Sequence, residues 1–231
     1  MDRPLVLGLE TSGPRSAVGL LDAGGFRREF AREGTGHDEV LLGLVDRALA
    51  EAGAGLDAVG LIGVTAGPGM FTSLRVGLAT ALGLGLPRAI PLKAVGTLAA
   101  LARAADQSSR VLALVDARRG QVYCALHDGP AELLPPRLIE PSGLAGLIRP
   151  LITGPTVAAG SGVQLCLAAL DALGIADTGI RHPGALAVAE LARDMLAREG
   201  PDRPEDLVPR YLRRTDAELN RERQDGSGPP A

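Results

Sequence analysis

The stretch Thr65-Ala66-Gly67-Pro68-Gly69-Met70-Phe71-Thr72-Ser73-Leu74-Arg75-Val76-Gly77 decides the fold. A strand cannot continue through Gly67-Pro68-Gly69, because proline lacks a backbone donor and glycine is conformationally loose. Thr72 or Ser73 can then cap a helix, which the apolar and small residues up to Leu86 continue. The stretch therefore predicts a strand, a tight turn and a helix over Thr72–Leu86.

The predicted helix lacks a polar face. Between Leu74 and Leu86 it carries one charge, Arg75, and its other residues are mostly apolar or small. A surface helix normally shows one apolar stripe, so a helix that is apolar on all sides must pack against other protein on two opposite sides. Thirteen residues are too few to cross a bilayer. One side therefore belongs to the core, and the other either contacts another protein chain or is enclosed by the chain's own domain.

Composition bounds the class of protein. A chain of 231 residues suits one large domain or two small ones, and a net charge of −3 argues against broad electrostatic binding of nucleic acid. Cys124 and Cys166 lie in apolar runs without the spacing of a disulfide framework or metal site, so we expect buried thiols. Glu10 interrupts the first apolar run, so we expect no signal peptide, no membrane anchor and a cytoplasmic location.

A sequence pattern occurs twice along the chain. Leu5–Glu10 and Val111–Asp116 are apolar runs that end in a carboxylate, and Asp22 and Asp128 follow them twelve residues later at predicted hairpin turns. The two copies are thus offset by 106 residues. We predict an α/β fold of two similar halves with mixed sheets and a cleft between them. Chance similarity between two buried strands is the alternative.

The remaining pattern predicts the other elements. Predicted strands are Ser16–Leu21, Phe26–Ala31, Ala58–Val64, Ala89–Val95, Gln121–His127, Glu132–Ile139 and Thr156–Ala159. Predicted helices are Asp38–Ala52, Gly96–Arg103, one within Pro141–Arg149, Val163–Leu173 and Leu186–Arg198. We assign residues 1–105 to a first half, on which residues 185–214 pack, and residues 106–184 to a second half. Residues 215–231 are expected to be a disordered tail.

Candidate ligand-binding residues lie where the predicted strands end. Loops such as Glu10-Thr11-Ser12 and Asp116-Ala117-Arg118 can coordinate a phosphate and a metal-bound water, but such carboxylates can also only form turns or pair with arginine. Gly160-Ser161-Gly162 could hold phosphates at a helix N-terminus, although it lacks the rest of a nucleotide-binding fingerprint. The candidate cleft or nucleotide residues are Glu10, Thr11, Ser12, Asp116, Arg118, Gly160 and Gly162.

Catalytic machinery is sparse in this sequence. His37, His127 and His182 are scattered, and no two histidines have the helical spacing of a metal site. No Gly-x-Ser-x-Gly turn contains a serine that we would assign as a nucleophile. We therefore expect no catalytic residue, no metal and no cofactor of the chain's own.

Five segments in one order carry a family resemblance. They are Leu7–Ser12, His37 before Leu41-Leu42, Ala66–Gly77, Asp116-Ala117-Arg118 with Val122-Tyr123, and Pro209–Arg213. Together they are similar to the TsaB family, also called YeaZ, of bacterial threonylcarbamoyladenosine biosynthesis proteins. The resemblance implies an actin/sugar-kinase/Hsp70-like (ASKHA) fold, built from two ribonuclease-H-like halves.

The resemblance also implies a role. TsaB-like chains support TsaD, the catalytic subunit that transfers threonylcarbamoyl to an adenosine beside the tRNA anticodon. TsaD-like chains carry a His-x-x-x-His metal motif, whereas Gly96–Leu101 contains no histidine here, which implies a non-catalytic subunit. Glu10 stands where TsaB-like chains usually carry Asp, which leaves nucleotide contact open. The alternative is an ATP-dependent phosphotransferase or a glycoprotease-like enzyme of the same superfamily.

The implied partners are a TsaD-like subunit, a TsaE-like ATPase and, in isolation, a second copy of the chain. Contact with tRNA is implied only through the complex, which can also bind ATP or ADP. Pairing through Asp38–Ala52 and Thr72–Leu86 agrees with Gly77, Ala81 and Gly85, a smooth row that permits close helix approach. The predicted partner-binding residues are Leu41, Leu42, Val45, Leu49, Leu74, Gly77, Leu78, Ala81, Leu82 and Gly85.

Overall fold

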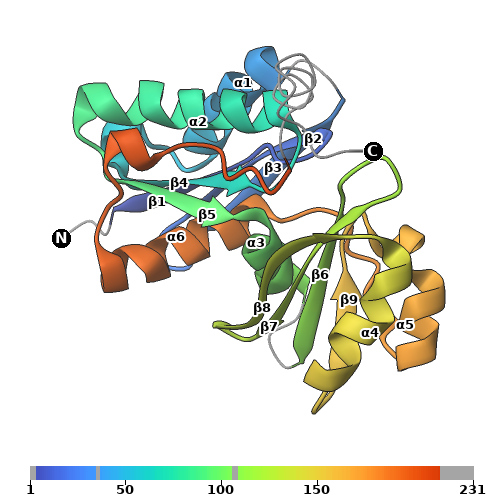
Figure 1. The fold of residues 1–231 in the computed structure, drawn as a ribbon. Coiled ribbons are helices and arrows are strands. Elements are labelled where there is room, and N and C mark those ends of the chain that lie inside the picture. The colour runs from blue at the N-terminus through green and yellow to red at the C-terminus, as the bar shows by residue number, and fades with distance from the viewer. Residues whose placement is uncertain (1–3, 35–36, 106–108, 214–231) are drawn as a thin grey trace, which may run out of the picture.

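A computed structural model describes residues 4–34, 37–105 and 109–213, and it contains two five-stranded mixed sheets (Figure 1). The first sheet consists of β1 (Leu5–Glu10), β2 (Arg15–Leu21), β3 (Arg27–Glu33), β4 (Val59–Gly67) and β5 (Leu92–Gly96). The second consists of β6 (Arg110–Asp116), β7 (Val122–Asp128), β8 (Ala131–Ile139), β9 (Thr156–Ala159) and β10 (Ala176–Asp177). The helices are α1 (His37–Glu51), α2 (Phe71–Gly85), α3 (Thr97–Ala105), α4 (Leu144–Ile148), α5 (Leu167–Leu173) and α6 (Ala185–Glu199).

The two sheets share one topology. Their strand orders are β3-β2-β1-β4-β5 and β8-β7-β6-β9-β10. In each, the first three strands pair antiparallel and the last two pairings are parallel. The two apolar runs that repeat in the sequence, Leu5–Glu10 and Val111–Asp116, are the central strands β1 and β6. The predicted α/β class with two mixed sheets is therefore confirmed.

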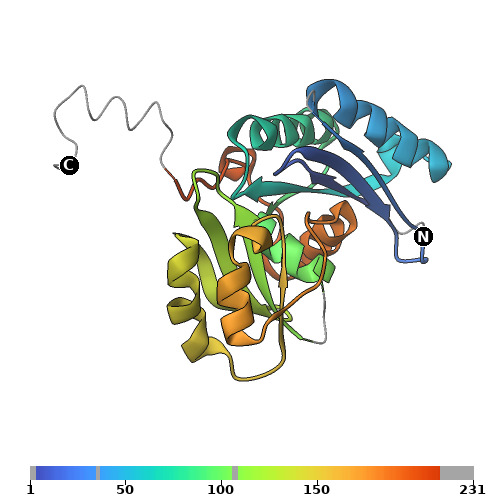
Figure 2. The same ribbon diagram turned by 90° about the vertical axis from the view of Figure 1, so that its right-hand side faces the viewer.

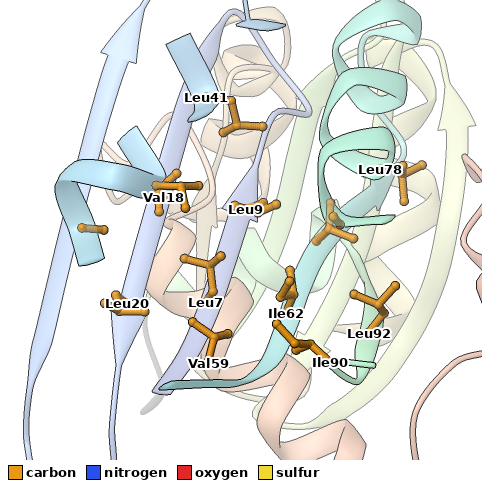
Figure 3. Close-up of a cluster of buried hydrophobic side chains, with 14 of the residues drawn as sticks. Leu7, Leu9, Val18, Leu20, Leu41, Val59, Ile62, Leu78, Ile90 and Leu92 are labelled. Atoms are coloured by element: carbon orange, nitrogen blue, oxygen red, sulfur yellow. The ribbon is translucent and has the colours of Figure 1, made fainter. Parts of the chain in front are cut away.

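Both faces of the first sheet are covered by helices. Leu7 and Leu9 on β1 belong to the cluster under α1 and α2 (Figure 3), whereas Val6, the residue before Leu7, belongs to a cluster with Val188 of α6. This alternation follows from the strand period of two. Full burial of one such leucine stabilises the fold by about 2 kcal/mol relative to an exposed one.

Helix α6 lies directly on glycines of the first sheet. A Cβ on Gly8 would come within 2.1 Å of the carbonyl oxygen of Ala185, and a Cβ on Gly63 would lie 2.4 Å from the Cβ of Ala192. Only glycine permits so close an approach. The helix predicted over Leu186–Arg198 is thus present as α6, held on the first sheet although it follows the second sheet in sequence.

Helices α3 and α6 lie between the two sheets (Figures 1 and 2). Leu98 and Leu101 of α3 pack with Val111 and Ala113 of the second sheet, while Ala100 of the same helix joins the α6 cluster. The far face of the second sheet is covered by α4 and α5. The two sheets are therefore joined by the pair of helices α3 and α6.

Two local predictions are wrong. The N-cap of α2 is Met70, with no side-chain cap hydrogen bond, so neither Thr72 nor Ser73 caps this helix. The single helix predicted over Val163–Leu173 is instead a 3-10 turn, Val163–Leu165, followed by α5. The break falls at Cys166, whose side chain is buried in the core of the second half.

The predicted division of the chain into halves stays a prediction, and the predicted tail 215–231 lies outside the residues that the structure describes. Within residues 4–34, 37–105 and 109–213, no helix combines the length and apolar character needed to cross a membrane.

Candidate functional site

Glu10 ends β1 as a buried carboxyl group. It is 1% exposed, and Ser12 donates its backbone N–H to Oε1 over 2.7 Å and its hydroxyl to the same oxygen. Burial raises the pKa of Glu10 to about 7, although both Ser12 hydrogen bonds oppose that rise. Thr11 makes other contacts: its N–H donates to the hydroxyl of Thr65, and its own hydroxyl oxygen has no hydrogen-bond partner among the described residues.

Asp116 ends β6 at the equivalent place in the second half. Its Oδ1 accepts the backbone N–H of Arg118 over 2.7 Å, and its Oδ2 lies 3.3 Å from Nη1 of the same arginine. Arg118 and Arg119 both have positive φ, 62° and 57°, a conformation that costs a non-glycine residue about 1 kcal/mol. The strained turn directs the side chain of Arg118 outward, where it is 69% exposed.

A cleft of about 170 Å³ separates these two strand ends. Ser12 and Gly13 line it from the first half, and Asp116, Arg118 and Ser161 line it from the second. The cleft thus brings together the predicted residues Ser12, Asp116 and Arg118. Glu10 is absent from its lining, because this carboxyl group lies beneath Ser12.

The backbone N–H groups of Gly160 and Gly162, in the predicted phosphate loop, already donate hydrogen bonds to carbonyls of the chain itself. The N–H of Gly160 donates to the carbonyl of Ile180 over 2.7 Å, and that of Gly162 donates to Leu114 over 3.0 Å. A Cβ on Gly160 would lie 1.9 Å from the same Leu114 carbonyl. The glycines therefore serve close packing against β6, and their N–H groups cannot cradle a phosphate as predicted. Ser161, by contrast, accepts the N–H of Asp116 over 3.1 Å.

The sequence does not predict several of the residues that line the cleft. Met70 enters from the turn before α2, and Arg181 and His182 enter from the segment before α6. Burial is the main cause that lowers the pKa of His182. Nothing in the sequence around a lone histidine marks it, because its position depends on the path of the chain between the two halves.

The predicted partner-binding residues mostly face the chain's own core. Leu42 is exposed at 49% and Leu82 is partly buried, whereas the other eight are buried. These eight are Leu41, Val45, Leu49, Leu74, Gly77, Leu78, Ala81 and Gly85. The prediction that the row Gly77, Ala81 and Gly85 faces a partner is therefore wrong. A Cβ on Gly77 would lie 2.2 Å from Oγ1 of Thr11, so the row permits close approach to the sheet.

The outward face of α2 is shifted from that row by about half a turn. Its exposed residues are Phe71, Thr72, Arg75, Ala79 and Gly83. Beside it, α1 exposes Leu42, and Leu86 follows α2 with 53% exposure. Beyond Arg75 the rest of α2 carries no charged side chain. We call this surface, formed by Leu42, Arg75, Ala79, Gly83 and Leu86, the outer helix face.

An aromatic stack borders the outer helix face. The rings of Phe71 and Tyr211 lie 5.1 Å apart and 20° from parallel. The guanidinium of Arg75 lies 3.8 Å from the centre of the Phe71 ring, and its Nε donates to the hydroxyl of Tyr211 over 3.2 Å. Arg75, the charged residue of α2, is thus engaged in a cation–π contact within the chain. The segment Pro209–Arg213 is thereby attached to the start of that helix.

Over the part of the chain that the structure describes, no three His, Cys, Asp or Glu side chains gather where they could hold a metal ion.

Comparison with known proteins agrees with this geometry. Residues 22–141 match the family model "TsaD: tRNA N6-adenosine threonylcarbamoyltransferase". The chain is 32% identical to the tRNA threonylcarbamoyladenosine biosynthesis protein TsaB of Escherichia coli over 123 residues, 52% of this chain and 53% of that protein. The match thus spans about half the length of that relative.

Solved structures extend the comparison. YeaZ from Pseudomonas aeruginosa superposes with a TM-score of 0.77 at 28% identity, over 90% of this chain and all of that one. The ROK hexokinase of Thermus thermophilus has a TM-score of 0.50 at 16% identity, over 83% of this chain and 99% of that one. At that identity only the fold is shared, and the fold is that of the ASKHA class.

Proposed function

Because the chain belongs to the family of tRNA threonylcarbamoyladenosine biosynthesis proteins that includes TsaB, also called YeaZ, we propose that it is a non-catalytic partner subunit in the formation of this modified nucleoside. The catalytic step belongs to a TsaD-like subunit. A TsaE-like ATPase, ATP or ADP, and tRNA engage the assembled complex, and a second copy of the chain takes the partner's place in isolation.

The outer helix face is the observation that carries this proposal. Leu42 and Leu86 each expose about half of a large aliphatic side chain, and exposed apolar surface is typical of protein–protein interfaces. Ala79 and Gly83 give the middle of the face a low profile, which permits a helix of another chain to approach closely. We propose that two helices of a TsaD-like subunit pack here against α1 and α2, which would form a four-helix interface.

A charge on the outer helix face tests the interface. Ala79 is exposed in the middle of α2, so Ala79→Arg should fold normally yet place an unpaired cation inside the contact, which costs several kcal/mol. Size-exclusion chromatography with the cognate TsaD-like protein at micromolar concentration should show loss of co-elution. Ala168→Arg adds the same charge to an exposed position of α5 in the second half and should co-elute like the wild type.

Ala79→Arg that keeps its circular dichroism spectrum and still co-elutes would place the interface elsewhere. Ala81 is unsuitable for this test, because it is fully buried and an arginine there would disrupt the core whether or not a partner binds.

The non-catalytic role rests on the sequence. Gly96–Leu101, where TsaD-like chains carry paired histidines, contains none here. The purified chain should therefore show no kinase or peptidase turnover without its partner. A reconstituted assay in which Asp116→Asn abolishes nucleoside formation while the TsaD complex stays intact would instead favour the enzyme alternative.

A further inference from the structure

Two adjoining cavities lie on the opposite side of the first sheet from the outer helix face. Their volumes are about 370 Å³ and 340 Å³, within the range of small-molecule sites. Both are lined by Arg103 of α3, Arg198 of α6, and His127, Gly129 and Pro130 of the β7–β8 hairpin. The larger cavity continues over Gly67-Pro68 to Arg210. Neither cavity includes Ser12 or Asp116, so they are separate from the cleft between the strand ends.

His127 is an unsatisfied polar group in the wall of both cavities. It is 6% exposed, and its Nε2 has no hydrogen-bond partner within the described part of the chain. Burial lowers the pKa of His127, so the ring is neutral and one nitrogen can donate a hydrogen bond. Buried polar atoms of folded proteins nearly always have a partner. A ligand that accepts a hydrogen bond from Nε2 would supply one.

Two arginines in the walls of these cavities are available to bind an anion. Two acidic lining residues already have cationic partners, since Asp194 lies 2.8 Å from Arg103, and Glu199 lies 2.9 Å from Lys93, which it shares with Asp202. Glu132 remains on the acidic side. On the basic side, Arg198 and Arg210 form no ion pair with any residue of the described ranges. Arg198 and Arg210 are therefore the lining cations without a carboxylate partner in those ranges, and Arg198 lines both cavities together with His127.

The rest of the larger cavity wall is apolar. Leu98 and Ala99 of α3 face it from one side, and Leu191 and Met195 of α6 contribute from the other. We propose that these cavities bind a small organic anion, with its carboxylate held by His127 and Arg198 and its apolar body between α3 and α6. This site is independent of the proposed function, because α1 and α2 cover the other face of the sheet.

Three small molecules of one shape and different charge test the proposal. Benzoate, benzamide and benzamidine would each be titrated into the full chain while the imidazole resonances are recorded by NMR. His127, His37 and His182 are the chain's histidines, so the last two are internal controls. Benzoate should shift His127 alone and bind about tenfold more tightly than benzamide, the gain expected for a charge-assisted hydrogen bond. Benzamidine should not bind.

Variants sharpen the test. Arg198→Ala should weaken benzoate binding by about tenfold, whereas Arg149→Ala, an exposed arginine on the far side of the second sheet, should leave it unchanged. Ala99→Phe should fill the larger cavity and abolish binding. The proposal is overturned if benzoate shifts His182 instead of His127, if benzamide binds as tightly, if none of the three binds, or if Arg198→Ala binds benzoate like the wild type.

Discussion

Ser12 donates two hydrogen bonds to one oxygen of Glu10, from its backbone N–H and from its hydroxyl. The two groups hold a buried carboxyl whose pKa is raised from 4.5 to about 7, mainly by burial. A raised carboxyl pKa means that the folded state binds the proton more tightly than the unfolded state. The stabilisation is complete below about pH 4.5 and is lost as the pH rises through 7.

Glu10→Gln should therefore change stability in a pH-dependent way. The variant keeps the shape but cannot ionise, so its free energy of unfolding relative to wild type should rise by on the order of 3 kcal/mol between pH 4.5 and pH 8. Urea denaturation at both pH values measures the difference. An identical difference at the two pH values would show that Glu10 has an ordinary pKa.

Two glycines of α2 should respond to alanine in opposite ways. A Cβ on Gly77 would lie 2.2 Å from Oγ1 of Thr11, so Gly77→Ala should lower the free energy of unfolding by about 1–3 kcal/mol. Gly83 has no atom within 4 Å of an added Cβ, so Gly83→Ala should raise stability by up to about 1 kcal/mol through helix propensity. Thermal unfolding compares the pair. Equal effects would mean that the row Gly77, Ala81, Gly85 does not face the sheet.

Asp202 should be important for stability although it follows the last helix. Lys93, 3% exposed, places its Nζ 2.7 Å from Oδ1 of Asp202, and Oδ2 accepts the N–H of Ala94 over 2.7 Å. Burial alone would lower the pKa of Lys93, but the hydrogen bonds to Asp202 and Glu199 raise it on balance. Asp202→Ala should cost about 3 kcal/mol, since it leaves a buried cation with fewer partners.

Asp206→Ala is the matched control for Asp202, because Asp206 lies four residues later in an exposed pair with Arg203 and its loss should leave the urea midpoint nearly unchanged. Similar midpoints for the two variants would argue that Lys93 tolerates the loss.

The two thiols should be inert in the folded protein. Burial raises the pKa of Cys124 and of Cys166 to about 11, and only the thiolate reacts. Ellman's reagent at pH 8 should therefore detect almost no thiol in buffer and two per chain in urea. Rapid release of one equivalent from the native protein would contradict the buried placement of that cysteine.

The sequence predicts strands and helices well where their hydrophobic period is clear. β1 and β6 match Leu5–Glu10 and Val111–Asp116 at or within one residue, because runs bounded by charge leave little choice of boundary. The failures are local. The predicted helix is divided at Cys166, whose side chain packs with residues of several strands and helices that are distant in sequence, and such contacts cannot be read from its neighbours.

The face of α2 could not be assigned from sequence. Both Gly77-Ala81-Gly85 and Ala79-Gly83 are rows of small residues, and a helix without a polar side gives no orientation. What separates them is Thr11, 66 positions away from Gly77, at the end of β1. The cleft shows the same limit: Ser12, Asp116 and Arg118 stand out in the sequence, whereas His182 is found only by tracing the chain.

The return of α6 to the first sheet has a consequence for biosynthesis. Until residues 185–199 have emerged from the ribosome, the face that carries Val6, Leu21 and Leu61 lacks α6, and only Ala100 of α3 can pack on it from a helix. The second sheet, by contrast, is complete by Asp177. The half that is translated first is thus the half that matures last, and a nascent chain must keep an apolar surface from aggregating while the other half is made.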